Sequence, residues 1–319
     1  MGINKELESM NQNKIVVPLD GSELSERVLQ YAKTPAVRVG TEVILLHVCD
    51  PAECHCEAGK CTVQPMHRVY VEHTAEKVRK ELETAATSKI NIGWEVLVGD
   101  PATQIINYAT ENNACRIIMA AHGRSGVGQW VLGSVAEKIA RVSPIPVVIV
   151  RTFTNEAQRS NSPDAKILVL LDGSNVAEQV LPYAMEHADI WSREVMLLHV
   201  CEPPYTEQRV ANYLTLPGHS PVTEQEQYVE KEMIKCKEKA KEYLVGIEKQ
   251  FRDNRLKVNS EILEGNTAEM IVDYVIKNPF NLIAMTTHGR SGLSRWAFGS
   301  VADRVVHTAS SPLLLVRPH

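Results

Sequence analysis

An internal duplication constrains this chain more than any other feature of its sequence. The stretch KIVVPLDGS at 14–22 returns as KILVLLDGS at 166–174. A glycine-rich stretch, AAHGRSGVGQWVLGS at 120–134, returns as TTHGRSGLSRWAFGS at 286–300. A chain of 319 residues has room for two ordinary domains. The repeat therefore predicts two similar domains in tandem rather than one large fold.

The borders of the repeat predict the domain boundaries. The first domain is expected over residues 12–152 and the second over residues 166–319. The linker between them, residues 153–165, reads FTNEAQRSNSPDA and is polar with a Ser-Pro near its end. Such a composition is typical of exposed, irregular chain.

Composition and charge exclude several classes of protein. The net charge is -5 and the isoelectric point is near 6.1, so the chain carries no broad basic footprint for nucleic acid or an acidic membrane. No apolar run approaches the roughly 20 residues that span a bilayer. The N-terminal stretch MGINKELESMNQNK is polar and lacks the apolar region of a secretory signal. The sequence therefore predicts a cytoplasmic protein with no nucleic-acid or membrane partner.

Each copy alternates short apolar runs with helical patterns. The expected strands of the first copy are residues 15–18, 43–48, 95–98, 116–120 and 146–150. Ser22 and Asp100 each follow a strand and suit a helix N-cap, and Pro101 suits the first helical turn. Strands that alternate with helices predict parallel βαβ units. We therefore predict an α/β fold of two tandem, doubly wound, five-stranded parallel-sheet domains.

Two distant motifs are expected to meet in one crevice of each domain. In a doubly wound sheet, ligands bind beyond the carboxyl ends of the strands, where the strand order reverses. With the order 3-2-1-4-5, strands one and four flank that point. Asp20 follows strand one, and residues 120–123 follow strand four. In the second copy, Asp172 and residues 286–289 are expected to meet in the same way.

The residue types in this crevice suit a nucleotide. A purely structural role for the glycine-rich turn explains the same residues equally well. A carboxylate after strand one can accept hydrogen bonds from ribose hydroxyls, and glycines let backbone N–H groups approach phosphates. Gly133 and Ser134 precede a predicted helix whose N-terminus favours an anion. Glycine-rich turns between strand and helix are also common where backbones pack closely. The usual Rossmann and Walker glycine spacings are both absent.

Several motifs resemble the universal stress protein family. They are VVPLDGS, LLHV, GDPATQII and HGRSGVGQWVLGSVAEKIARVSPIPVVIV in the first copy, and HGRSGLSRWAFGSVADRVVHTASSPLLLV in the second. The resemblance covers nearly all of both copies. It implies a fold similar to the adenine nucleotide alpha hydrolases and an ATP-binding, stress-response regulatory function without dedicated catalysis. A slow ATP hydrolase remains an alternative.

The resemblance also implies a binding motif that is incomplete here. ATP-binding members carry G-x2-G-x9-G-[ST] after the fourth strand. This chain matches the later positions but has Ala120 and Thr286 where the first glycine stands. If that glycine serves through its backbone N–H, a small residue suffices. If it needs a positive φ, alanine and threonine weaken binding.

The resemblance assigns equivalent nucleotide-binding residues to both copies. In the first copy they are Pro18, Leu19, Asp20, Val48, Met119, Ala120, Gly123, Gly133, Ser134 and Val135. In the second copy they are Leu170, Leu171, Asp172, Val200, Met285, Thr286, Gly289, Gly299, Ser300 and Val301. The implied cofactor is ATP or a related adenine nucleotide, with Mg²⁺ as a candidate companion, and no residue is assigned a catalytic role.

The resemblance further implies that the final strands pair. Residues PVVIVR of the first copy and PLLLVR of the second are expected to join the domains as an internal pseudo-dimer. Pairing would also cover two strand edges that otherwise favour aggregation. Association of two chains into a homodimer is a further possibility that the sequence leaves open.

A cysteine-rich loop belongs to the first copy only. Cys54, His55, Cys56 and Cys61 have no counterparts in the second copy. Three thiolates and one imidazole could hold zinc, and thiol redox sensing or an incidental loop are the alternatives. A nucleotide-free scaffold, or a metal or thiol sensor acting through this loop, is therefore the alternative function.

Overall fold

The computed structural model describes residues 14–51, 55–57, 60–83, 90–122, 132–151, 166–204, 222–278, 280–288 and 298–318. The first copy supplies β1 (Lys14–Pro18), β2 (Glu42–Cys49), β5 (Ile92–Val98), β6 (Arg116–Ala120) and β7 (Val147–Val150). The second supplies β8 (Lys166–Leu170), β9 (Val195–Cys201), β10 (Val258–Glu264), β11 (Phe280–Thr286) and β12 (Leu313–Val316). A separate hairpin joins β3 (His55–Glu57) to β4 (Lys60–Thr62).

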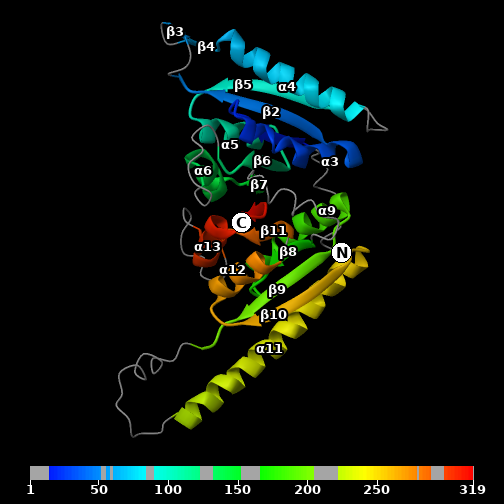
Figure 1. Ribbon diagram of the computed structural model, residues 1–319, viewed down its shortest axis with the longest axis vertical. Helices are drawn as coiled ribbons and strands as arrows, with labels where there is room; N and C mark the ends of the chain where they lie inside the picture. The colour runs from blue at the N-terminus through cyan, green and yellow to red at the C-terminus, as the bar shows by residue number, and fades with distance from the viewer. Residues whose placement is uncertain are drawn as a thin grey trace.

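The two copies share one ten-stranded sheet (Figure 1). Its order is β10-β9-β8-β11-β12-β7-β6-β1-β2-β5. Each half has the strand order 3-2-1-4-5 with every pair parallel. The predicted doubly wound, five-stranded fold is therefore confirmed in both copies.

The halves meet at the two final strands. β7 and β12 pair antiparallel, with Val148 opposite Leu314. Both residues are buried. The predicted pairing of the final strands is confirmed, and it leaves β5 and β10 as the outer strands of the common sheet.

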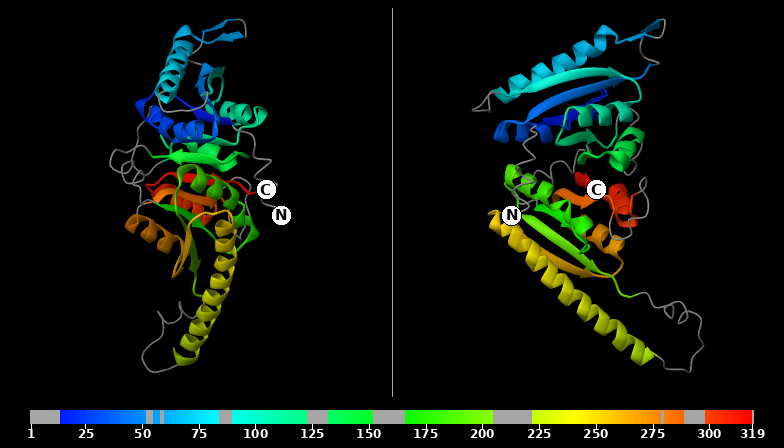
Figure 2. Two further views of the ribbon diagram at one scale, coloured as in Figure 1. Left: turned by 90° about the vertical axis from the view of Figure 1, so that its right-hand side faces the viewer. Right: turned by 180° about the vertical axis from the view of Figure 1, so that it is seen from behind.

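Helices cover both faces of this sheet (Figure 2). One face carries α2 (Glu23–Glu26), α3 (Leu29–Val39), α4 (Pro65–Glu83), α8 (Asn175–Glu178), α9 (Leu181–Trp191) and α11 (Val222–Asp253). The other carries α5 (Pro101–Glu111), α6 (Ser134–Val142), α12 (Thr267–Lys277) and α13 (Ser300–Thr308). Alternate residues of β1 point to opposite faces of the sheet. Ile15 and Val17 belong to the core on one face, and Val16 belongs to the core on the other face. Burial on both faces explains why these strands read as continuous apolar runs.

The helix starts follow the local sequence signals. The Ser22 side chain accepts a hydrogen bond from Ser25 N, and Asp100 accepts one from Thr103 N. Pro101 occupies the first turn of α5, where a backbone N–H has no helical partner. Both predicted N-caps are confirmed.

Three arginines, of which Arg116 and Arg151 are buried and Arg317 is half-buried, connect the two halves near the paired final strands. Arg151 donates to the carbonyl of Val306, and Arg317 donates to the carbonyl of Val142 at 2.9 Å. The two contacts are similar, because each arginine follows a final strand and reaches the last turn of the helix in the other half, although the accepting carbonyls are not at equivalent positions. Arg116 forms an ion pair with Glu186 across the same boundary.

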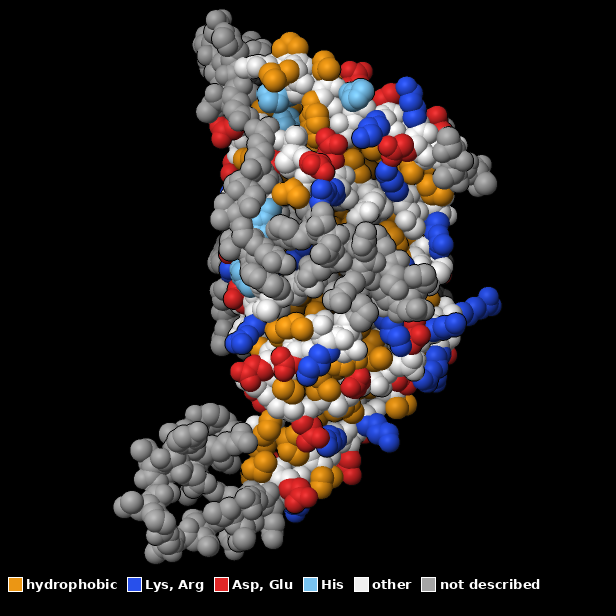
Figure 3. All heavy atoms as spheres, in the orientation of Figure 1, with side chains coloured by type: hydrophobic (Ala, Val, Ile, Leu, Met, Phe, Trp, Pro, Cys, Tyr) orange, Lys and Arg blue, Asp and Glu red, His pale blue; other side chains and the backbone are white. Residues whose placement is uncertain are grey.

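The surface of the described residues mixes both signs of charge. Figure 3 shows acidic and basic side chains interspersed over both halves of the face it draws. None of the helices in the described segments combines the length and the apolar composition that a membrane crossing requires.

Candidate functional site

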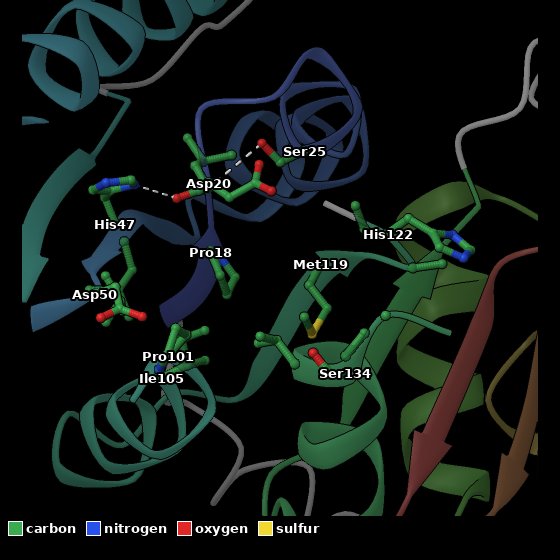
Figure 4. A pocket seen from close by; sticks show the side chains of 18 residues that line it. Pro18, Asp20, Ser25, His47, Asp50, Pro101, Ile105, Met119, His122 and Ser134 are labelled. Atoms are coloured by element: carbon green, nitrogen blue, oxygen red, sulfur yellow. Dashed lines mark hydrogen bonds between the residues drawn. The ribbon is translucent and has the colours of Figure 1, made fainter. Parts of the chain in front are cut away.

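A cavity of about 350 Å³ lies at the carboxyl ends of β1 and β6. Figure 4 shows Pro18, Met119 and Ser134 around this space, from β1, β6 and the start of α6. The volume falls within the range of small-molecule sites, about 300–1,000 Å³. A second cavity of about 410 Å³ lies at the equivalent place in the other half, between β8 and β11.

The structure brings the predicted site residues together. In the first cavity these are Pro18, Leu19, Asp20, Val48, Met119, Ala120, Gly133, Ser134 and Val135. In the second they are Leu170, Leu171, Asp172, Val200, Met285, Thr286, Gly299, Ser300 and Val301. Gly123 and Gly289 lie outside the described residues. The predicted meeting of strands one and four at one crevice is therefore confirmed in each half, whereas nucleotide binding by these residues stays a prediction.

The Asp-Gly-Ser motif orients a carboxylate on each cavity wall. Asp20 Oδ1 accepts hydrogen bonds from Ser22 N at 3.0 Å and Ser22 Oγ at 2.6 Å. Asp172 and Ser174 repeat this arrangement at 2.9 and 2.6 Å. The turn depends on the glycine between them, since Gly21 has a φ of 85° that other residues rarely adopt. Residues within the motif thus supply these two hydrogen bonds to each carboxylate.

The glycine before α6 serves a close backbone contact. Gly133 N donates to Ala121 O at 2.8 Å, and a Cβ at Gly133 would lie 3.2 Å from that oxygen. Gly299 N makes the same bond to Thr287 O at 2.9 Å. This contact places the N-terminus of the helix against the end of β6. The next backbone N–H groups, those of residues 134–136, precede the first helical bond and lie at the cavity.

The incomplete glycine motif carries no backbone strain. Ala120 and Thr286 are the last residues of β6 and β11. Among the described residues, the non-glycine positions with positive φ are Asn113, Ser192 and Arg255. Ala120 and Thr286 therefore adopt no positive φ in this structure, and which of the two alternatives holds for nucleotide binding stays a prediction. The Thr286 hydroxyl donates to His288 O at 2.7 Å.

Several side chains that line the cavities were not among the nucleotide-binding residues predicted from the sequence motifs. His47 and Asp50 line the first cavity, and His199, Glu202 and Cys236 line the second. His47 is 2% exposed, and its Nδ1 lies 2.7 Å from Leu19 O (Figure 4). The motif LLHVC recurs in both copies, and this repetition could have indicated that His47 and His199 lie at the two cavities. No local pattern marked Cys236.

A second histidine, His122, lines the first cavity just after β6. This residue is buried. Burial, followed by the charge of Arg151, lowers the pKa of His122. The imidazole is therefore neutral at pH 7 and adds no positive charge to the cavity.

The cysteine-rich loop is only partly described. Cys54 lies outside the described residues. His55, Cys56 and Cys61 lie on the β3–β4 hairpin, where Cys56 and Cys61 are register partners. The predicted zinc site in this loop stays a prediction.

Comparison with known proteins agrees with this architecture. A profile of the Universal stress protein family matches residues 12–151 and 165–317. The chain belongs to the universal stress protein family. It is similar to a universal stress protein of Mycolicibacterium smegmatis, with 22% identity over 316 residues, covering 98% of this chain and 99% of that protein. It is also similar to universal stress protein YxiE of Bacillus subtilis, with 32% identity over 152 residues, covering 44% of this chain and 99% of YxiE.

A solved structure that covers nearly the whole chain shows the same fold. A universal stress protein of Archaeoglobus fulgidus superposes with a TM-score of 0.63 and 21% identity, covering 96% of this chain and 98% of that one. A further universal stress protein, 24% identical at a TM-score of 0.33 and covering 44% of this chain and 97% of its own, has been solved in complex with cAMP. Because the family profile matches both copies, the chain is a tandem member of this family.

Proposed function

We propose that this universal stress protein is a regulator that binds ATP or a related adenine nucleotide in one or both cavities. The observation that supports the proposal is the repeated arrangement of an oriented carboxylate and a helix N-terminus across one cavity. A nucleotide needs both, since its ribose donates hydrogen bonds and its phosphates accept them. The bound state would act on a partner through conformation or contact, without dedicated catalysis.

Each part of the nucleotide has a matching group on the wall of the first cavity. The Asp20 carboxylate would accept hydrogen bonds from the ribose hydroxyls. The backbone N–H groups at the start of α6 would donate hydrogen bonds to phosphate oxygens. Leu19, Val48 and Met119 supply apolar surface for the adenine. Mg²⁺ would accompany the phosphates and neutralise part of their charge. The domain boundaries, the linker over residues 153–165, the cytoplasmic location and a homodimer of chains stay predictions.

Nucleotide titration tests the proposal directly. The purified chain is denatured to identify any released nucleotide, and the apo chain is then titrated with ATP, ADP, AMP and cAMP by calorimetry. Replacing Asp20 or Asp172 with Asn removes a charged acceptor worth about 1.5–3 kcal/mol. We therefore expect roughly tenfold to hundredfold weaker binding at the altered cavity.

The matched control is Asp189→Asn, which changes an exposed carboxylate on α9 away from both cavities. It should leave affinity unchanged. A chain that releases no nucleotide and binds none at millimolar concentration would contradict the proposal, as would equal affinities for the Asp20→Asn and Asp189→Asn variants. ATP turnover faster than about 1 per second would favour an enzyme instead.

A further inference from the structure

Two clusters of nitrogen and sulfur ligands lie beside the cavities, outside the cysteine-rich loop. The first comprises His47, Cys49 and His67, and the second comprises His199, Cys201 and Cys236. Within each cluster, one ligand atom from every residue lies within 4.8 Å of the others. The strand residues are buried, with exposed fractions of 5% or less. Imidazole and thiolate are the ligands that zinc-type ions prefer.

The clusters occupy equivalent places in the two halves. His-x-Cys ends β2 and recurs at the end of β9. The third ligand comes from the helix that packs over that strand, α4 or α11. The buried stripes of the two helices align with one constant offset, pairing Val71 with Ala240, Ala75 with Leu244, Val78 with Ile247 and Leu82 with Phe251. The same offset pairs His67 with Cys236.

This equivalence is informative because the helix residue differs between the copies. Simple copying of a packing position would preserve an apolar residue or the same side chain. The helix residue is instead a histidine in one copy and a cysteine in the other, and both can bind a transition metal. Both positions therefore carry a side chain that can ligate a metal, although the residue type differs.

Hydrogen bonding prepares His47 to bind a metal ion. Its Nδ1 lies 2.7 Å from Leu19 O, and a carbonyl only accepts, so Nδ1 carries the proton. Nε2 therefore holds the lone pair, and it lies 3.0 Å from His67 Nδ1. Metal-binding histidines usually donate their other N–H to a carbonyl or carboxylate in this way. An ion bound by both nitrogens would replace this hydrogen bond, and the proton of His67 would then be carried on its Nε2.

The second cluster offers two sulfurs and one nitrogen. Cys201 is fully buried at the end of β9 and forms a hydrogen bond with Cys236. Ligand atoms of a tetrahedral zinc site are about 3.3–3.8 Å apart, from bond lengths near 2.0–2.3 Å. The upper bound of 4.8 Å on the separations in both clusters exceeds this spacing by about 1 Å, a gap that side-chain movement would have to close on binding.

We propose that His199, Cys201 and Cys236 bind a divalent ion of the zinc class, and that His47, Cys49 and His67 bind a second. Each ion would have three protein ligands and one open position. His47, His199 and Cys236 also line the cavities, so each ion would lie at a cavity wall. The metal sites do not depend on the proposed nucleotide binding.

Cobalt titration tests the proposal, because Co²⁺ replaces Zn²⁺ and absorbs visibly when thiolates bind it. The full chain carries Cys54→Ser, Cys56→Ser and Cys61→Ser so that the loop cannot contribute. It is reduced, stripped with a chelator and titrated with Co²⁺. We expect about two ions per chain, a sulfur-to-cobalt charge-transfer band, the visible bands of tetrahedral Co²⁺, and loss of both on adding Zn²⁺.

Single variants assign the sites. Cys236→Ser, at a half-buried helix position, and Cys201→Ala should each weaken the second site at least about a hundredfold, since they remove a direct ligand. His67→Ala should do the same to the first site alone. Cys115→Ser changes a thiol that contacts Lys14 O at 3.2 Å outside both clusters, and it should alter neither. Far- and near-ultraviolet circular dichroism confirms that each variant is folded.

Two results would overturn the proposal. One is a reduced, loop-altered chain that shows no charge-transfer band at millimolar Co²⁺. The other is a band that survives unchanged in a folded chain carrying both Cys236→Ser and His67→Ala. A chain that takes up no cobalt but forms a Cys201–Cys236 disulfide on oxidation would replace the metal proposal with a redox pair.

Discussion

Replacing Glu186 with alanine is expected to lower the free energy of unfolding by about 3 kcal/mol or more, because it leaves a buried charge without its partner. Arg116 begins β6 and is 3% exposed. Its guanidinium forms an ion pair with Glu186 on α9, in the other half of the chain. Since a guanidinium stays protonated in proteins, Arg116 cannot become neutral when the carboxylate is removed.

Urea denaturation followed by circular dichroism measures this effect. The double variant Arg116→Met, Glu186→Leu should recover most of the lost stability, since it removes the charge along with its partner. Glu232→Ala breaks an exposed pair with Lys235 and should leave the unfolding midpoint almost unchanged. If Glu186→Ala proved no more destabilising than Glu232→Ala, the pair would contribute nothing to the junction of the two halves.

The free energy of unfolding is also expected to fall as the pH drops from about 6.5 towards 3, because of His187. Burial, followed by the charge of Arg116, lowers the pKa of His187 to about 3. The ring is 4% exposed and stacks on Trp191 at 5.3 Å between ring centroids. In the unfolded chain this histidine has an ordinary pKa near 6.5. Between about pH 6.5 and pH 3, the unfolded chain therefore binds a proton at His187 that the folded chain does not bind. Stability from this residue is complete above pH 6.5 and is lost by up to about 1.4 kcal/mol per pH unit below it.

Denaturation at several pH values between 7 and 5 checks this slope, in a range above the titration of most carboxylates. His187→Phe should flatten the slope by close to one proton, whatever its effect on stability at pH 7. His73→Gln, at an exposed position on α4, should keep the slope of the parent chain. A slope that is unchanged in His187→Phe would show that the imidazole is protonated in the folded state.

Much of the fold was predictable because its determinants are local. The Asp-Gly-Ser turn and the Asp100–Pro101 helix start each depend on residues within one turn of chain. The strand order and the pairing of β7 with β12 followed from the repeat and the family resemblance together with the rule for doubly wound sheets. The same reasoning placed Asp20 and Ala120 at one cavity, although they are far apart in the sequence.

The sequence by itself determined the duplication, the α/β class, the helix caps and the oriented carboxylates, since each depends on neighbouring residues or on periodicity. Only the tertiary structure showed that Gly133 donates its N–H to Ala121 O, that Ala120 adopts no positive φ, and that Arg116 is a buried ion-pair partner of Glu186. The contact between His67 and His47 was likewise visible only in the tertiary structure. These contacts join separate elements, and their geometry depends on how helices pack on the sheet, which no local pattern specifies.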